Sequence, residues 1–246
     1  MSIAVVTGAS SGIGAATAKL LAKNGFQVIA AARRFDRLNE LTKSSENIEA
    51  IQLDVTDQKS VDNFVAALNG RKVALLVNNA GGAFDSASIE KTDPSIWQKT
   101  YEVNVIGALR ITKALLPNLR ANGKSHIIVV TSTAGHAVYE NGGSYTTAKH
   151  AELAFTQTLR LELNGEPIRI TEIAPGMVKT EEFSSVRLGS KDLAEKVYEG
   201  VAEPLLAEDI AETIRWSAML PAHVNIDSLI VRPVAQAANH KIHRVK

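Results

Sequence analysis

The sequence predicts an α/β protein built on a doubly wound parallel β-sheet of about seven strands, with helices on both faces. Short apolar runs rich in β-branched residues recur along the chain, and such runs suit strands that are covered on both faces. Segments with helical periodicity separate these runs and are long enough for right-handed crossovers. No linker, repeat or low-complexity stretch interrupts the 246 residues, so residues 1–246 are expected to form a single domain.

Seven apolar runs are the expected strands. They are, in order, Ile3–Thr7, Gln27–Ala32, Ile48–Leu53, Val73–Asn78, His126–Thr131, Arg169–Ile173 and Leu229–Val231. Helical periodicity with cap and stop signals predicts the helices between them. These are Ile13–Asn24, a short helix with Asp36 as its N-cap, Gln58–Asn69, Pro94–Leu119, Tyr145–Asn164 and Glu208–Met219. The more polar segment 178–200 follows the sixth strand and is a candidate substrate lid over the carboxyl ends of the strands.

The composition argues against several classes of function. The formal net charge is +1, from 27 Lys and Arg against 26 Asp and Glu, which is no electrostatic footprint for nucleic acid or a membrane surface. No apolar run reaches the roughly 20 residues that a membrane span needs. The chain has no cysteine, which excludes disulfides and thiolate metal ligands. The first residues lack the pattern of a signal peptide, so a cytoplasmic location is expected.

A glycine-rich loop follows the first strand and opens the first helix. The spacing of Gly8, Gly12 and Gly14 allows a tight turn and a close backbone approach to an anion. Unpaired N–H groups and the helix dipole at this N-terminus favour a pyrophosphate. We interpret the loop as a dinucleotide-binding loop, and the alternative is a plain tight turn between strand and helix.

Two arginines follow the second strand, where a protein that prefers NAD carries an acidic residue. The guanidinium groups of Arg33 and Arg34 can bind a 2′-phosphate through charge-assisted hydrogen bonds worth about 1.5–3 kcal/mol each. The pair therefore predicts NADP(H) as the cofactor, the alternative being two solvated surface side chains. Asp54 and Val55 end the third strand, and the Asp54 carboxylate is expected to accept a hydrogen bond from the adenine amino group.

Ser132, Tyr145 and Lys149 form a predicted proton-transfer group. A four-residue spacing on a helix places Tyr145 and Lys149 on one face, so the ammonium can lower the pKa of the phenol from about 10 towards the working pH. The Ser132 hydroxyl can hold the substrate oxygen. A Ser-His-Asp hydrolase is the rival reading for Ser132, but no G-x-S-x-G pattern surrounds it. His136 lies between Ser132 and Tyr145 in the sequence and is a candidate for the substrate pocket.

Asparagines mark two further positions. The segment Asn78–Gly81 closes the fourth strand, either as part of the site or as a plain polar turn. Asn104 lies inside a long apolar helix, where asparagine is a poor helix former and a buried amide needs partners. It predicts a kink or a water site that feeds a proton relay. The six histidines have no metal-ligand spacing, so no metal is expected.

Together these motifs resemble the short-chain dehydrogenase/reductase family, whose fold is a single Rossmann-type domain. The resemblance covers nearly the whole chain and rests on Thr7–Gly14, Asn78–Gly81, Asn104, Ser132, Tyr145, Lys149 and Pro175-Gly176. It implies that Tyr145 is the general acid/base, that Ser132 polarises the substrate oxygen, and that Lys149 tunes Tyr145 and binds the ribose. Asn104 would anchor the relay. The implied NADP(H) contacts are Gly8, Ser10, Ser11, Gly12, Ile13, Gly14, Arg33, Arg34, Asp54, Val55, Asn79, Ala80, Gly81, Tyr145, Lys149, Pro175, Gly176 and Val178.

Later segments resemble the NADP-dependent 3-hydroxy acid dehydrogenases within this family. The segments are Pro175–Val178, Glu182–Arg187, Leu220–Asp227 and Pro233–Gln236. The resemblance implies activity on serine, L-allo-threonine or 3-hydroxypropionate-type acids, or on their oxo forms, and a homotetramer.

Such a substrate needs a partner for its carboxylate. Arg187 is the candidate, because arginine binds carboxylates bidentately, and simple surface exposure is the alternative. Ser132, His136 and Tyr145 are the other expected substrate contacts. Two rival functions stay open: an NADPH-dependent carbonyl or 3-oxoacyl reductase of the same family, and a non-catalytic NADPH-binding protein.

Overall fold

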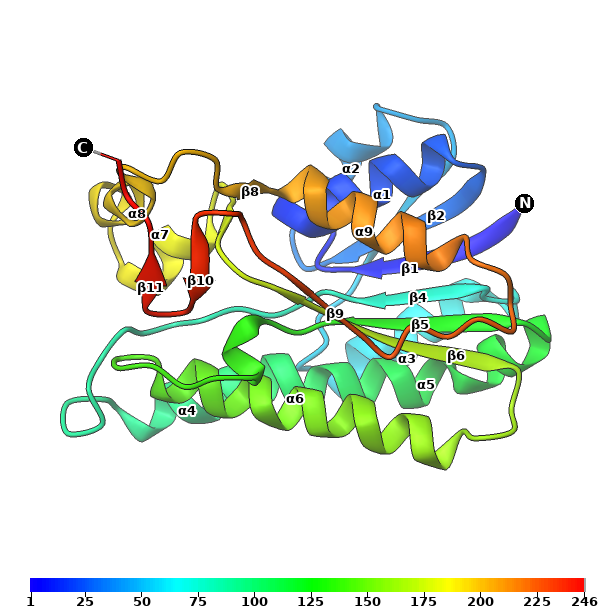
Figure 1. Cartoon of the computed structure of the whole chain (residues 1–246). Helices are drawn as coiled ribbons and strands as arrows, with labels where there is room; N and C mark the ends of the chain where they lie inside the picture. The colour runs from blue at the N-terminus through cyan, green and yellow to red at the C-terminus, as the bar shows by residue number, and fades with distance from the viewer. Residues whose placement is uncertain (246) are drawn as a thin grey trace.

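Seven parallel strands form the centre of the molecule, in the order β3-β2-β1-β4-β5-β6-β9 (Figure 1). The computed structural model describes residues 1–245, so Lys246 of the predicted domain lies outside the described residues. The strands are β1 Ser2–Thr7, β2 Phe26–Ala32, β3 Ile48–Gln52, β4 Leu75–Asn78, β5 Ser125–Val130, β6 Ile168–Pro175 and β9 Ser228–Val231. All seven predicted strands are present, and the predicted doubly wound parallel sheet is confirmed.

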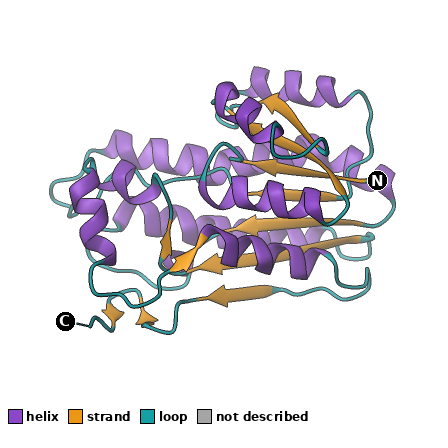
Figure 2. Cartoon of the chain, turned by 90° about the horizontal axis from the view of Figure 1, so that it is seen from above, coloured by secondary structure: helices purple, strands orange, loops and turns teal. Residues whose placement is uncertain are grey.

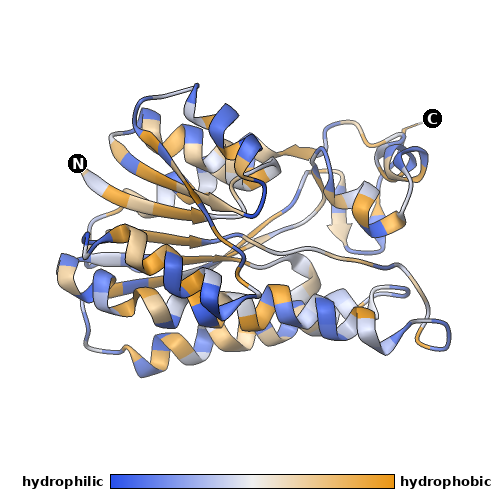
Figure 3. Ribbon diagram, turned by 180° about the vertical axis from the view of Figure 1, so that it is seen from behind, coloured by the Kyte–Doolittle hydropathy of each residue, from blue (hydrophilic) through white to orange (hydrophobic). Residues whose placement is uncertain are grey.

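Helices cover both faces of the sheet in two layers (Figures 1 and 2). One layer holds α1 Gly12–Lys23, α2 Phe35–Thr42 and α9 Ala207–Ala218. The other holds α3 Gln58–Leu68, α4 Pro94–Tyr101, α5 Gly107–Asn122 and α6 Gly143–Glu162. Figure 3 shows the hydrophobic residues on the strands and on the helix faces turned towards them. The alternation of strand and helix in the sequence therefore produces a three-layer arrangement.

The core lies on both faces of the sheet because successive strand residues point in opposite directions. Val6 and Val28 are buried against the layer of α1 and α9, whereas Val5 and Ile29 are buried against the layer of α3 and α5. The strands β1, β2 and β4 are thus apolar on both faces over most of their length, as their sequences indicate.

The strand order reverses direction at β1, which pairs with β2 on one side and with β4 on the other. In open parallel sheets a crevice opens at this point, beyond the carboxyl ends of the strands. The loops that leave β1, β4, β5 and β6 all lie at this end of the sheet, at the left of Figure 1. Residues far apart in the sequence therefore meet at one place.

The predicted helix over Pro94–Leu119 is interrupted. The chain forms α4, then a π-helical turn η1 over Glu102–Ile106, and then α5. The buried side chain of Asn104 lies in η1 and donates a hydrogen bond to the carbonyl of Thr100 one turn earlier (2.7 Å). A wider turn of this kind is frequent at functional sites. The kink that Asn104 predicts is therefore a local widening of the helix.

The predicted N-cap Asp36 differs from the structure by two positions. Arg34 is the N-cap of α2, and Asp36 lies in the first turn, where its charge complements the helix dipole. The segment 178–200 is largely helical, with α7 Phe183–Leu188 and α8 Lys191–Tyr198. It lies beyond the carboxyl ends of the strands.

Short elements complete the described chain. They are the 3₁₀ turn η2 Thr133–Gly135, the pair β7 Val178–Lys179 and β8 Leu205–Leu206, and the hairpin β10 Gln236–Ala238 and β11 Lys241–Ile242. Within residues 1–245 no helix is long and apolar enough to cross a membrane.

Gly14 tests the close packing of the β1 loop. A Cβ added at Gly14 would lie 2.8 Å from the backbone carbon of Gly8 and 2.5 Å from Nδ2 of Asn79. We expect Gly14→Ala to lower the free energy of unfolding by about 1–3 kcal/mol, because the overpacking outweighs the gain of roughly 1 kcal/mol in helix propensity. Urea unfolding followed by circular dichroism measures the change.

The matched control is Gly82→Ala. A Cβ at Gly82 meets only the ring of Phe84, at 3.5 Å, and its backbone is not left-handed. Equal stabilities of the two variants would contradict the packing argument.

Candidate active site

Hydrogen bonds from Thr7 and Asn79 tie the ends of β1 and β4 together. The Thr7 hydroxyl donates to the carbonyl of Val77 (3.2 Å) and accepts from the backbone N–H groups of Asn79 and Ala80, each at 3.0 Å. The Asn79 amide donates to the Thr7 carbonyl at 2.9 Å. These bonds, centred on the buried Thr7, fix the floor of the crevice.

The glycine-rich loop has the shape that an anion site requires. Gly8 and Gly12 have φ values of 66° and 52°, in the left-handed region that favours glycine. A Cβ at Gly8 would lie 2.9 Å from the Cα of Ala80, so no other residue fits without a shift. Ser11 is the N-cap of α1, and its side chain makes no capping bond. The first N–H groups of α1 therefore remain available to a ligand.

Arg34 forms hydrogen bonds with hydroxyl and carboxylate groups at the rim of the crevice. Its Nη2 donates to Oγ of Ser11 (2.9 Å) and to Oγ of Ser10 (3.0 Å). Its Nη1 lies 2.6 and 2.7 Å from the two carboxylate oxygens of Glu182. Arg37 Nη1 lies 2.5 Å from Glu182 Oε1. Glu182 is thus held by two guanidinium groups, and its hydrogen bond to Arg34 lowers the pKa of its carboxyl group.

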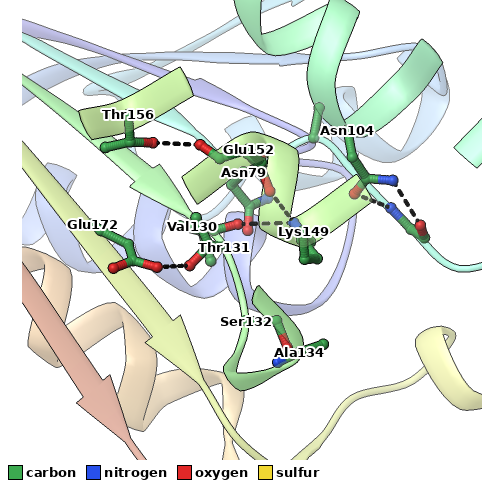
Figure 4. Close-up of polar contacts among 12 residues, drawn as sticks. Asn79, Asn104, Val130, Thr131, Ser132, Ala134, Lys149, Glu152, Thr156 and Glu172 are labelled. Atoms are coloured by element: carbon green, nitrogen blue, oxygen red, sulfur yellow. Dashed lines mark hydrogen bonds and ion pairs between the residues drawn. The ribbon is translucent and has the colours of Figure 1, made fainter. Parts of the chain in front are cut away.

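The three residues of the predicted proton-transfer group come from neighbouring elements. Ser132 follows β5 and begins η2, where its Oγ accepts from the N–H of Ala134 at 3.1 Å. Tyr145 and Lys149 lie on α6, and Nζ of Lys149 lies 5.7 Å from the centre of the Tyr145 ring. Figure 4 shows Ser132 and Lys149 beside the end of β5. Tyr145 is 7% exposed, so its side chain is buried, and it lines the crevice.

Lys149 is buried and already has two partners. Its Nζ donates to the carbonyl of Val130 (3.1 Å) and to Oε2 of Glu152 (2.6 Å). Burial alone would lower the pKa of Lys149, but the acidic groups around it, Glu152 foremost with Tyr145 and Glu172, together outweigh burial and the pKa is raised. An ammonium has three donors, so one remains for the crevice.

Asn104 holds the loop after β4 from the far side. Its Nδ2 donates to the carbonyl of Gly82 (2.8 Å), and its Oδ1 accepts from the Gly82 N–H (3.2 Å). A Cβ at Gly81 would lie 2.5 Å from Oδ1 of Asn104 and 3.6 Å from Nζ of Lys149. The backbone of Gly81 therefore lies between the side-chain amide of Asn104 and the ammonium of Lys149.

A cleft of about 780 Å³ contains most of the predicted site residues. Those that line it are Gly8, Ser10, Ser11, Gly12, Ile13, Arg33, Arg34, Asp54, Val55, Asn79, Ala80, Gly81, Ser132, Tyr145, Lys149, Pro175, Gly176, Val178 and Arg187. Gly14 and Asn104 lie buried behind its wall. The Asp54 carboxylate is partly occupied, because Oδ1 accepts from the N–H and hydroxyl of Thr56 at 2.9 and 2.7 Å.

His136 does not line this cleft. Its Nε2 lies 2.8 Å from Oε1 of Glu172, a buried carboxylate that also accepts from the hydroxyls of Thr131 (2.5 Å) and Ser228 (2.6 Å). The imidazole contacts Glu172 on β6, and it does not share the cleft lined by Ser132 and Tyr145.

Arg187 is placed over the cleft by α7. Its guanidinium lies 5.3 Å from the centre of the Tyr139 ring, and its two hydrogen bonds, to the carbonyls of Asp85 and Asn141, are long at 3.4 Å. Among residues 1–245 no carboxylate forms an ion pair with it. The described residues also contain no cluster of three or more potential metal ligands.

Sequence reasoning missed several residues of the cleft. They are Tyr139, Thr180, Glu182, Phe183 and Gln236. The Phe183 ring packs edge-on against Tyr145 at 5.5 Å, and Gln236 accepts from the N–H of Met177 at 2.7 Å. Thr180 Oγ1 is buried without a hydrogen-bond partner. The polar stretch Lys179–Glu182, which follows Pro175-Gly176 after two apolar residues, was the available signal for Thr180.

The family model for short chain dehydrogenases matches residues 2–190. The chain belongs to the short-chain dehydrogenase family. The predicted family and fold are therefore confirmed, and the chain is an oxidoreductase by family.

Three relatives match along almost the whole chain. An uncharacterized oxidoreductase of Mycobacterium tuberculosis is 49% identical over 96% of this chain and 92% of its own length. An NADP-dependent 3-hydroxy acid dehydrogenase of Escherichia coli K12 is 36% identical over 98% of this chain and 99% of its own. The solved closed form of a serine dehydrogenase complexed with NADP+ has a TM-score of 0.92 and 36% identity, over 99% of this chain and 100% of that one. The names of the second and third agree with the predicted cofactor, NADP(H).

The residues present fit a phosphorylated dinucleotide. The free N-terminus of α1, the close approach at Gly8 and the unpartnered hydroxyl of Thr180 line one continuous cleft. Arg33 and Arg34 line the same cleft. The arginines suit a 2′-phosphate, because guanidinium groups bind phosphate through charge-assisted hydrogen bonds. The glycine-rich loop and the helix N-terminus suit a pyrophosphate.

Proposed function

We propose that this chain oxidises short 3-hydroxy acids with NADP, or reduces their oxo forms with NADPH. The observation that carries the substrate class is Arg187. It is a cationic group on the wall of the cleft, without an acidic partner among the described residues. Since arginine binds carboxylates bidentately, this position suits an acid better than a neutral alcohol.

The protein's own residues account for the proton chemistry. In the oxidative direction Tyr145 removes the proton from the substrate hydroxyl, while Ser132 holds the same oxygen by a hydrogen bond. Lys149 favours the phenolate by its charge, and its free donor is available to the ribose. Bound NADP supplies the hydride acceptor. Asn104 keeps the loop between it and Lys149 in place by its bonds to Gly82.

The lid and the assembly extend the proposal. Segment 178–200 contributes Thr180, Phe183 and Arg187 to the cleft, so we propose that it closes over the substrate. We also propose a homotetramer, since Leu109 on α5 and Leu161 on α6 are 44% and 78% exposed. The mass in solution tests the tetramer.

The reaction is tested first by NADPH formation with L-serine, L-allo-threonine, 3-hydroxypropionate and a simple secondary alcohol. We expect the acids to react with NADP, and Tyr145→Phe to lower kcat by about 100-fold or more, because the general base is lost. The control is Tyr101→Phe, which changes a 44% exposed side chain. Reaction of the alcohol alone would reject the acid substrate but keep the family, and NADPH binding without any turnover would favour a non-catalytic protein.

Arg34 tests the cofactor preference. We expect Arg34→Ala to raise the KM for NADP by roughly 10- to 150-fold and that for NAD far less, because the lost charge-assisted hydrogen bonds reach only a 2′-phosphate. Arg33→Ala shows whether the second guanidinium shares this contact. Initial rates with both cofactors measure the effect, and equal changes for NADP and NAD would rule out the assignment.

Glu182→Gln is expected to change the KM for NADP in the direction opposite to Arg34→Ala. The Glu182 carboxylate takes the same Arg34 guanidinium that a 2′-phosphate needs. Because the pair is partly exposed, we expect only a modest decrease of roughly 2- to 5-fold in the KM for NADP. An increase would show that Glu182 helps to hold the cofactor.

Arg187 tests the substrate class directly. We expect Arg187→Ala to raise the KM for a 3-hydroxy acid by about 10- to 100-fold, with little change for a secondary alcohol, since only the acid loses a charge-assisted contact. Arg187→Lys is the matched variant that keeps the charge without the bidentate geometry. A similar change for acid and alcohol would show that Arg187 only shapes the lid.

A further inference from the structure

A second buried charge lies directly behind the catalytic lysine. The carboxylate of Glu152 lies 2.6 Å from Nζ of Lys149, one turn further along α6. Both side chains are almost fully buried, with 5% of Lys149 and 2% of Glu152 exposed. Figure 4 shows Glu152 on the side of the ammonium away from Ser132. The proton-transfer steps above use Lys149 but give no role to Glu152.

Stability alone does not explain a carboxylate at this position. A buried ion pair loses hydration on both partners, and well-packed apolar residues of similar volume often stabilise a fold as well or better. Lys149 could also be held by the carbonyl of Val130 without a carboxylate. The contact therefore points to a role in setting the position and the field of the ammonium.

We propose that Glu152 is a positioning residue of the dehydrogenase reaction, which anchors the Lys149 ammonium and moderates the positive charge that Lys149 presents to Tyr145. The proposal rests on the proposed function. When Glu152 is ionised, it offsets the Lys149 charge and weakens the preference for phenolate. When Glu152 is protonated, the full charge of Lys149 acts on the phenol.

The surroundings of Glu152 allow it to change protonation near neutral pH. Burial raises the pKa of Glu152 from its ordinary value of 4.5 to about 7, despite the opposing charge of Lys149. Glu172 on β6 raises the pKa further. Other charged groups on elements packed against α6 have partners of their own. Lys99 of α4 lies over the Phe84 ring, Glu102 of η1 pairs with Arg110, and Arg169 of β6 donates to the carbonyls of Ser217 and Ala218.

The first test compares the pH dependence of kcat/KM in the oxidative direction for Glu152→Gln and the unaltered enzyme. The glutamine keeps an acceptor for Lys149 but removes the negative charge. We expect the rising limb of the profile to move to lower pH by roughly one unit, because the Lys149 charge is no longer offset. The KM for substrate should stay within about 2-fold, since no group that contacts substrate has changed.

Glu162→Gln is the matched control. It makes the same chemical change at an exposed position of the same helix. Its profile should coincide with that of the unaltered enzyme. A Glu152→Gln profile that also coincides would overturn the proposal and leave Glu152 a purely structural group.

The second test needs neither substrate nor cofactor. A carboxyl group whose pKa is raised on folding contributes stability that is fully present below about pH 4.5 and is lost as the pH rises through about 7. We therefore expect the urea midpoint of the unaltered protein to fall between pH 5 and pH 8 relative to that of Glu152→Gln. Parallel midpoints would show that Glu152 does not titrate in this range and would overturn the proposed switch in charge.

The two tests separate failure of this inference from failure of the proposed function. An unaltered enzyme that turns over none of the substrates refutes the proposed function, while the unfolding midpoints still report on Glu152. A Glu152→Gln protein that unfolds during purification is replaced by Glu152→Asp, which keeps the charge but shortens the side chain. The aspartate variant should lower kcat without moving the profile, and a moved profile would contradict the charge argument.

Discussion

The site depends on one hydrogen-bonded junction, where Thr7 at the end of β1 meets Asn79 after β4. This junction sits where the strand order reverses, so it fixes the crevice that a parallel sheet opens there. The loop that continues from Asn79 carries Gly81 between Asn104 and Lys149. The glycine-rich loop, Asn104 and Lys149 thus meet at a single short turn, and at Gly81 a Cβ would lie 2.5 Å from Oδ1 of Asn104, which leaves no room for a side chain.

The contacts of Asn104 also explain why the helix before α5 is widened. Asn104 must reach both Gly82 and the carbonyl of Thr100, and a regular helix would direct its amide differently. The change in helix geometry is confined to the π-helical turn, because α4 and α5 continue as regular helices on either side. The buried amide is satisfied at three positions, so it acts as a rigid support for the loop.

Local pattern predicted the strands, the glycine loop and the proton-transfer group, because each depends on residues close together in the sequence. The contacts that escaped prediction join distant segments. Glu182 meets Arg34 across 148 positions, and nothing local marks it as a partner for an arginine. His136 is drawn towards Glu172 from β6 rather than into the cleft. Glu152 resembles a surface residue of α6 in the sequence, and only the folded contacts show that it is buried.

Two carboxylates therefore act on the cationic groups of one cleft from different depths. Glu182 is partly exposed, so solvent and salt weaken its hold on Arg34, and an incoming phosphate can displace it at little cost. Glu152 is enclosed with Lys149, so neither partner can leave, and only a proton can change the interaction. The exposed pair is suited to exchange with a ligand, whereas the buried pair is suited to respond to pH. Burial, more than residue type, decides which kind of control each carboxylate provides.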